Sequence, residues 1–299
     1  MECVKGLANA IWSVNNDFFS SIKDSRGRMR AVLLIRPDIY NSLGLQNQNN
    51  KLRDNSVVLD WRTTYTSYRD SAIFKMADRL LSSQQEIRLE LGDVWDYYFP
   101  YNIKNVYVDH KKPTSFIEFL RYSLYRPRDI VTMLMILQEN FIEQHKDNNR
   151  VFSEEDFNSR DFKRKLSQYF LGEVKDQMSF YYSASDYEVF LRFFEFLKGS
   201  RSFNYQKYLK AYSSFIEFIT EKEITKPPFC ESADGFLQFL YALNVLCYLE
   251  ETYDGKVLVN MCFRERDYSN ISPKVKTHLR YEIHYGLRRA LNLGIRVRN

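Results

Sequence analysis

Glycine is scarce in this chain, with only ten in 299 residues. Hydrophobic residues make up 44% of the chain and aromatic residues 16%, mostly Phe and Tyr. A composition rich in apolar side chains and poor in glycine excludes a disordered chain and disfavours a turn-rich barrel. We therefore expect a mostly helical globular protein, and the length of the chain indicates two or three domains.

Long apolar runs and closely spaced cysteines are also missing. No run approaches the roughly 20 apolar residues that cross a bilayer, and the first residues lack the basic-then-apolar layout of a secretory signal. Cys3, Cys230, Cys247 and Cys262 are widely spaced, so neither a disulfide framework nor a structural zinc site is expected. The interpretation is a cytoplasmic protein with reduced thiols and no membrane partner.

Several motifs of enzyme chemistry are absent. The chain has no Gly-x-x-x-x-Gly-Lys-Ser/Thr, and its one Gly-Lys pair, Gly255-Lys256, is followed by Val257 and reads as a turn. No His-Glu-x-x-His or Gly-x-Ser-x-Gly occurs. The sequence therefore predicts no metal site, no nucleophile and no phosphate-binding loop of its own.

The first third of the chain, residues 1–110, has the pattern of a partial α/β region. Apolar residues at helical spacing fill Glu2–Ser21, and 64–82 also favours a helix. Met29–Ile35 and Ser56–Trp61 are short apolar runs typical of buried parallel strands, separated by a polar surface loop over 42–55. Two strands do not make a stable sheet, so further strands are expected ahead of Met1.

Residues 111–182 predict a helical, lid-like domain. A helix follows Ser115, and Pro127 suits the first turn of a second helix that runs from Arg128 to about 145. Ser153 begins a capping-box pattern, which predicts a helix to about Phe170. A serine-rich break near Ser183 marks the next boundary.

Residues 183–299 predict a helical domain that ends in a winged-helix-like module. Helices are expected over Asp186–Leu197, Tyr205–Lys222 and Asp234–Leu246. The Asp254-Gly255 dipeptide is a strong hairpin signal, and it is followed by basic residues. Helices followed by such a hairpin are typical of winged helices.

Positive charge is concentrated at the end of the chain. Residues 264–299 hold nine Lys/Arg and three Asp/Glu, so they carry an excess of +6 within a net charge of +5. Nucleic-acid phosphates are suitable partners for such a segment, and the alternative is a basic surface or a protein interface. The candidate nucleic-acid-binding residues are Lys274, Lys276, Arg280, Arg288 and Arg289.

Three arginines are candidates for contact with phosphates. Arg36 directly follows the predicted strand Met29–Ile35, at the edge of a sheet where ligands bind. Arg126 and Arg128 flank Pro127, whose ring fixes the backbone of a bidentate anion clamp, and Asp129 follows them. The alternatives are an ordinary ion pair of Arg36 with Asp38 or Asp60, and a solvated helix end at Arg128.

These segments resemble bacterial P-loop ATPases of the FunZ-like kind, which are similar to AAA, STAND and KAP NTPases. The resemblance rests on Val32–Ile39, Asn50–Asn55, Leu59–Trp61, Tyr125–Ile130 and Arg264–Lys276. It implies an ATP-binding domain with Walker A and Walker B motifs, a helical lid and a C-terminal helical region. Both Walker segments are absent here, so Met1 would fall after the Walker B strand.

By this resemblance Arg36 and Arg128 are catalytic arginines, and Arg126 and Asp129 are nucleotide-sensing. The first hypothesis is therefore a regulatory and partner-binding part of a P-loop NTPase, in a switch or defence role by analogy. It would bind ATP and Mg²⁺ only together with a Walker-containing segment or partner chain, and would be inactive alone. The alternatives are a winged-helix nucleic-acid-binding protein and a plain interaction module. Assembly of the chain into a homo-oligomer is compatible with each of these hypotheses.

Overall fold

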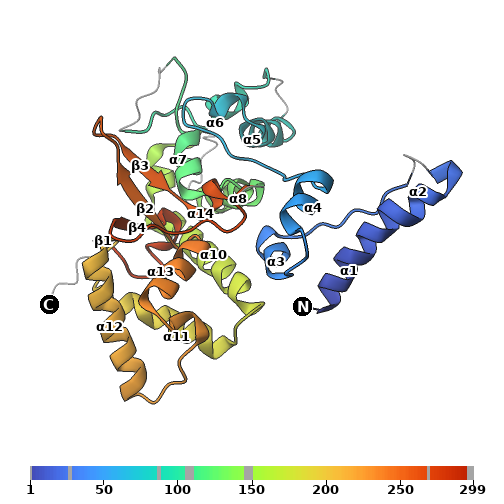
Figure 1. Ribbon diagram of the computed structural model, residues 1–299. Helices are drawn as coiled ribbons and strands as arrows, with labels where there is room; N and C mark the ends of the chain where they lie inside the picture. Colours follow the sequence, from blue (N-terminus) through green and yellow to red (C-terminus); the bar gives the residue numbers. More distant parts are fainter. Residues whose placement is uncertain are drawn as a thin grey trace. The chain divides into compact units, whose positions relative to one another are not determined.

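The computed structural model describes residues 2–25, 29–85, 89–104, 111–144, 151–267 and 270–294. The described chain is mostly helical with one small sheet, as the composition predicted (Figure 1). It divides into two compact units, Met1–Leu59 with Glu265–Pro273 and Asp60–Arg264 with Lys274–Asn299. We call them the N-terminal unit and the large unit.

The N-terminal unit begins with a helical segment. Figure 1 shows α1 (Glu2–Ser13) and α2 (Phe19–Ser21) as one rod, joined by a π-helical turn over Val14–Phe18. The predicted helix over Glu2–Ser21 is therefore confirmed, but none of its residues is buried. Two further helices follow, α3 (Pro37–Ser42) and α4 (Gln48–Asn55).

The predicted parallel strands are not formed among the described residues. Residues 29–36 and 56–61 are extended but belong to no sheet, and α4 occupies much of the segment expected to be a surface loop. Side chains in both extended segments are largely exposed, including Val32, Leu34, Val57 and Leu59. The α/β prediction for this region was wrong in this respect, because an apolar run encodes strand propensity but not the neighbouring strand that would bond to it.

The first half of the large unit is a set of helices around an aromatic core. After a 3₁₀ turn at Tyr68–Asp70 come α5 (Ala72–Ser82), α6 (Val94–Tyr98), α7 (Phe116–Tyr122) and α8 (Pro127–Gln144). The expected helix over 64–82 is thus formed in its second half. Helix α8 begins at Pro127, as predicted, because proline lacks only an N–H that would have no helical partner there.

Two serines set the helix boundaries of the next segment. Ser153 and Asp156 form the predicted capping box of α9 (Glu154–Asn158). Ser159 then caps a separate helix, α10 (Arg160–Ser179), by accepting a bond from the Phe162 N–H. The single helix predicted from Ser153 to about Phe170 is therefore two helices that continue to Ser179.

The last part of the large unit combines helices with the sheet. Its order is α11 (Ala184–Phe196), β1 (Ser202–Asn204), α12 (Tyr205–Glu221), α13 (Ala233–Ala242), β2 (Leu246–Glu251), β3 (Val257–Asn260), α14 (Cys262–Glu265) and β4 (Arg280–Ile283). All strand pairs are antiparallel, and the strand order is β1-β4-β2-β3. The predicted hairpin is confirmed, with Gly255 at φ +74° in its turn. Strands β1 and β4 were not predicted.

One cluster of buried residues runs through the large unit. It extends from Tyr68 to Leu293 and includes side chains from α5 to the last described turns. Trp95 is fully buried, stacks on Phe99, and donates its indole N–H to the hydroxyl of Ser115. The helices that carry the candidate residues are therefore anchored in a shared aromatic core.

Candidate functional site

The corner between α7 and α8 holds three of the four residues predicted for a nucleotide site, Arg126, Arg128 and Asp129. It turns at Tyr125, whose φ of +55° is unusual for a bulky residue. Tyr125 is buried, and its hydroxyl accepts a hydrogen bond of 2.6 Å from Arg264. The Arg264 guanidinium carbon lies 4.7 Å from the centre of the Tyr125 ring. Tertiary contacts thus hold the corner in a conformation that the local sequence disfavours.

Asp129 is the centre of this corner and has no exposed surface. Its carboxylate accepts hydrogen bonds from the Leu124 N–H at 2.8 Å and from the Tyr169 hydroxyl at 2.9 Å. It also forms an ion pair with Arg126, whose Nη2 lies 2.6 Å from Oδ1. Burial and the charge of Asp129 raise the pKa of the Tyr169 hydroxyl. Asp129 is therefore fully engaged by protein groups.

Arg126 bridges α8 and α10. Besides Asp129 it contacts Glu173, with Nη1 2.7 Å from Oε2. Burial lowers the pKa of Arg126, but Asp129 and Glu173 outweigh that effect and raise it overall. The guanidinium thus stays charged in its partly buried position. Through these contacts Arg126 links α8 to α10, which is a structural role. The nucleotide-sensing role of Arg126 and Asp129 stays a prediction.

Arg128 lies on the same corner but is open to solvent. Its side chain is 73% exposed, and its one ion pair within the described residues is a 3.5 Å contact with Glu173. The structure therefore brings Arg126, Arg128 and Asp129 together around Glu173. Of the three, Arg128 is the residue whose donors an external anion can reach.

Arg36 belongs to the N-terminal unit. It follows the extended residues 29–35 and immediately precedes α3. The prediction that Arg36 stands at the end of a buried strand was wrong, because that segment is not a strand. Asp60, one of its two suggested partners, instead pairs with Arg62 at 2.6 Å.

The five candidate nucleic-acid-binding residues are in different environments. Lys276 pairs with Glu250 at 2.6 Å, and Arg280 bonds to Ser202 at 2.9 Å. Arg288 is largely buried: it pairs with Glu282 at 3.1 Å and donates to the Ile283 carbonyl at 2.8 Å. Lys274 and Arg289 are exposed. Ion pairs with Glu250 and Glu282 offset part of the positive charge that this segment presents to a polyanion. The bond from Arg288 to the backbone occupies a donor that would otherwise contact a phosphate.

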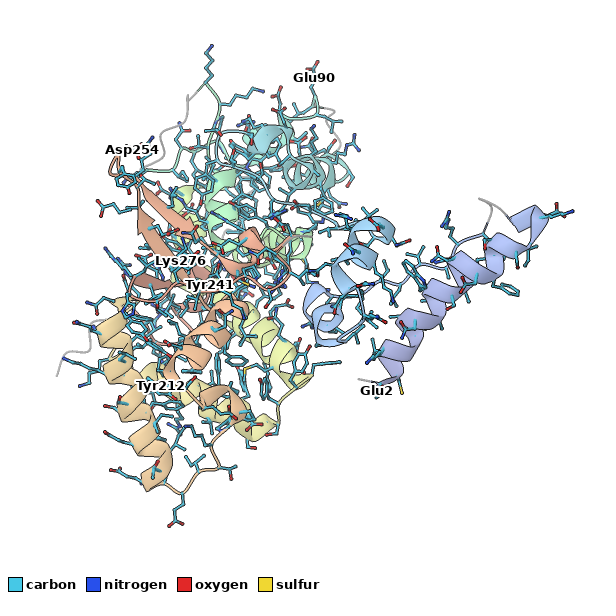
Figure 2. All side chains as sticks on the ribbon, in the orientation of Figure 1. Glu2, Glu90, Tyr212, Tyr241, Asp254 and Lys276 are labelled. Atoms are coloured by element: carbon cyan, nitrogen blue, oxygen red, sulfur yellow. The ribbon has the colours of Figure 1, made fainter. Side chains whose placement is uncertain are left out.

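The hairpin and α13 carry little positive charge. Asp254 lies at the tip of the hairpin, and Lys276 lies beside the sheet (Figure 2). The hairpin from β2 to β3 contains Glu250, Glu251 and Asp254 but only one cation, Lys256. Helix α13 contains Asp234 and no Lys or Arg. A winged helix that used these elements on nucleic acid would bring negative charge towards phosphates.

The sequence analysis missed two cations that the fold places beside Arg288 and Arg289. Lys163 and Arg201 line the same cavity as these two arginines. Lys163 lies in α10 and Arg201 in the loop before β1, and no sequence motif or run of charge marks either residue. Their shared position in the lining of the cavity identifies them.

In the parts of the chain that the structure describes, no group of three or more His, Cys, Asp or Glu residues is arranged to hold a metal ion. Among the same residues, no helix has both the length and the apolar character needed to span a bilayer.

Comparisons with known proteins give no relative: no family model, no curated protein and no solved structure matches this chain. The resemblance to P-loop ATPases therefore stays a prediction, and the function must be argued from the chain itself.

Proposed function

We propose that this chain is the regulatory and partner-binding part of a P-loop NTPase, and that its N-terminal unit binds the component that carries the phosphate-binding loop. The observation that carries the proposal is the exposure of four apolar side chains on two extended segments. Val32, Leu34, Val57 and Leu59 are 75–87% exposed. Apolar surface of this kind is stabilised by burial against a partner.

The N-terminal unit has few buried residues of its own. Among the residues from Glu2 to Leu59 whose burial the structure describes, the buried hydrophobic ones are Leu43 and Leu45. Ala31 exchanges two hydrogen bonds with the Asn15 side chain, at 2.8 and 2.9 Å, in the way that a neighbouring strand would bond. The following residues are already extended, so a partner strand could pair with them at little conformational cost.

Arg128 provides the second part of the proposed function. An NTPase transition state is stabilised by an arginine that reaches the transferred phosphoryl group from outside the phosphate-binding loop. Arg128 is exposed, and the Arg126–Asp129 pair fixes the corner from which it projects. In this proposal ATP and Mg²⁺ bind to the partner's loop, Arg128 contacts a phosphate, and the chain alone is inactive. The catalytic role of Arg36 stays a prediction.

The proposed function also includes a fold assignment for two parts of the large unit. The order α11, β1, α12, α13, β2, β3 is that of a winged helix, and β4 lies between β1 and β2. We propose that this region is a winged-helix-like module and that α7 to α10 correspond to an NTPase lid. The acidic hairpin favours a packing role for the module over nucleic-acid binding.

The test is identification of the partner. Tagged wild-type chain is purified from its source cells, bound proteins are identified by mass spectrometry, and ATP hydrolysis is measured. Val32→Asp with Leu34→Asp should abolish recovery of a P-loop protein. The matched control is Val257→Asp with Leu258→Asp, which changes exposed apolar residues of the large unit and should leave recovery unchanged.

The same preparation tests Arg128. Arg128→Ala should retain the partner and lower hydrolysis by roughly 10³-fold or more, since arginine fingers act on the transition state. ATP turnover by the purified chain alone would contradict the proposal. Recovery of a specific partner without a P-loop would identify a plain interaction module.

A further inference from the structure

The large unit contains a cavity of about 290 Å³ that the proposed function does not use. Its wall is formed by α7, α10, the loop before β1 and the turns after β4. The residues that line it include four cations, Lys163, Arg201, Arg288 and Arg289, and no Asp or Glu. Such a wall is suited to a compact anion, because low-dielectric surroundings strengthen the attraction.

Lys163 is the least satisfied of these cations. Its ammonium is buried and has no hydrogen-bond acceptor among the described residues. It lies 3.7 Å from the centre of the Tyr122 ring and 4.1 Å from that of Phe157. Cation–π contacts offset only part of the cost of removing an ammonium from water. The ammonium has almost no accessible surface, so it lies behind the cavity wall and does not face the cavity, and the charge that it meets is that of Glu118.

The other three cations differ in how much of their charge and hydrogen-bonding capacity is already used by protein groups. Arg288 lies 3.9 Å over the Tyr285 ring and pairs with Glu282, so its position is fixed and its charge is partly compensated. Arg201 and Arg289 are exposed and make no ion pair or side-chain hydrogen bond with the described residues. The cavity thus presents one recessed arginine, Arg288, and two exposed arginines, Arg201 and Arg289, to a ligand.

The volume of the cavity and the charge of its lining together limit which ligands it can bind. A volume of about 290 Å³ is close to the lower end of small-molecule sites, roughly 300–1,000 Å³. It would hold roughly ten water molecules at about 30 Å³ each, which is more space than a phosphate ion fills. A phosphate ester carries a charge of about −1.5 to −2, which matches the two cations that remain at the cavity, Arg201 and Arg289, because Arg288 is paired and the Lys163 ammonium lies behind the wall.

We propose that this cavity binds a small organic phosphate, with Arg288 at its wall and Arg201 and Arg289 at its opening. Duplex nucleic acid is a poorer occupant, since its backbone cannot reach a guanidinium whose side chain is only 13% exposed. The proposal concerns the large unit alone and does not depend on the proposed NTPase role.

Isothermal titration calorimetry tests the proposal on the full chain. Ribose 5-phosphate is the probe, ribose is the neutral control, and inorganic phosphate tests the anion alone. We expect binding of ribose 5-phosphate, weaker binding of phosphate and none of ribose. Arg201→Gln and Arg289→Gln should each weaken binding about tenfold or more, as expected for a hydrogen bond between charged groups.

Two controls make the result decisive. Lys274→Gln removes an exposed cation that is not among the lining residues and should change affinity less than about twofold. Thermal unfolding of Arg201→Gln and Arg289→Gln should match wild type, because both side chains are exposed. The proposal is overturned if neither phosphate compound binds up to about 10 mM, or if both arginine variants bind as wild type does. Displacement of ribose 5-phosphate by duplex DNA, with equal sensitivity to Lys274→Gln, would also overturn it.

Discussion

The guanidinium of Arg126 lies 2.6 Å from the carboxylate of Asp129, which has no exposed surface. Three residues apart in sequence, the two side chains form a buried ion pair that closes the turn between α7 and α8. Leu124 and Tyr169 donate to the same carboxylate. The Arg-Pro-Arg-Asp motif therefore divides into a brace, Arg126 and Asp129, and an exposed arginine, Arg128.

Substitution of Arg126 should destabilise the fold. Arg126→Met leaves the Asp129 carboxylate buried without its cation, and loss of one partner of a buried pair costs about 3–5 kcal/mol. Arg128→Met should change the free energy of unfolding by less than about 0.5 kcal/mol, because Arg128 is exposed. Urea unfolding of both variants measures the difference. Equal stabilities would remove the structural role assigned to Arg126.

His284 should make the fold sensitive to acid. Burial lowers the pKa of His284 to about 3, assisted by the charges of Arg288, Arg264 and Arg126. In the unfolded chain the pKa is about 6.5, so between these values the unfolded state binds more protons and stability falls as pH falls. The slope from this residue is about 1.4 kcal/mol per pH unit.

The variant that measures this contribution is His284→Asn. It retains an acceptor near the Gly286 N–H, which now bonds to His284 at 3.3 Å, and removes the titrating group. The difference in unfolding free energy between wild type and His284→Asn should shrink as pH falls from about 6.5 towards 4. A difference that stays constant over this pH range would show that His284 titrates normally.

Gly286 should not tolerate a side chain. A Cβ at this position would lie 2.4 Å from Cδ2 of Phe170, which is itself buried. Overpacking of this kind costs about 1–3 kcal/mol, so Gly286→Ala should unfold at lower urea concentration. Gly172→Ala is the matched control: Gly172 is exposed within α10 and nothing lies within 4 Å of its Cβ position. It should stabilise the protein by about 0.5–1 kcal/mol.

The local elements of the fold were largely predictable because their signals are local. Ser153 and Pro127 mark helix starts through bonds or constraints within one turn. The Asp254-Gly255 turn follows from the conformation that glycine allows. By contrast, Met29–Ile35 has the composition of a buried strand, but pairing depends on a second segment that the run does not encode.

The candidate site was predictable only in part for the same reason. Arg126 and Asp129 were identified from a short motif, but the partner that links them to α10, Glu173, lies 47 residues after Arg126. Lys163 and Arg201 reach one cavity from distant positions, and sequence periodicity does not record such proximity. Burial, which separates Arg126 from Arg128, likewise becomes visible only in the folded chain.

Hydrogen–deuterium exchange of the N-terminal unit tests the central claim most directly. The claim is that residues 32–35, which lie in no strand among the described residues, form one when a partner binds. In the isolated chain their amides should exchange at close to the unprotected rate, while those of α8 are strongly protected. In the complex recovered with wild-type chain, exchange of residues 32–35 should slow by about 100-fold or more, in keeping with a partner strand. Strong protection of these amides in the isolated chain, or no change in the complex, would contradict the account.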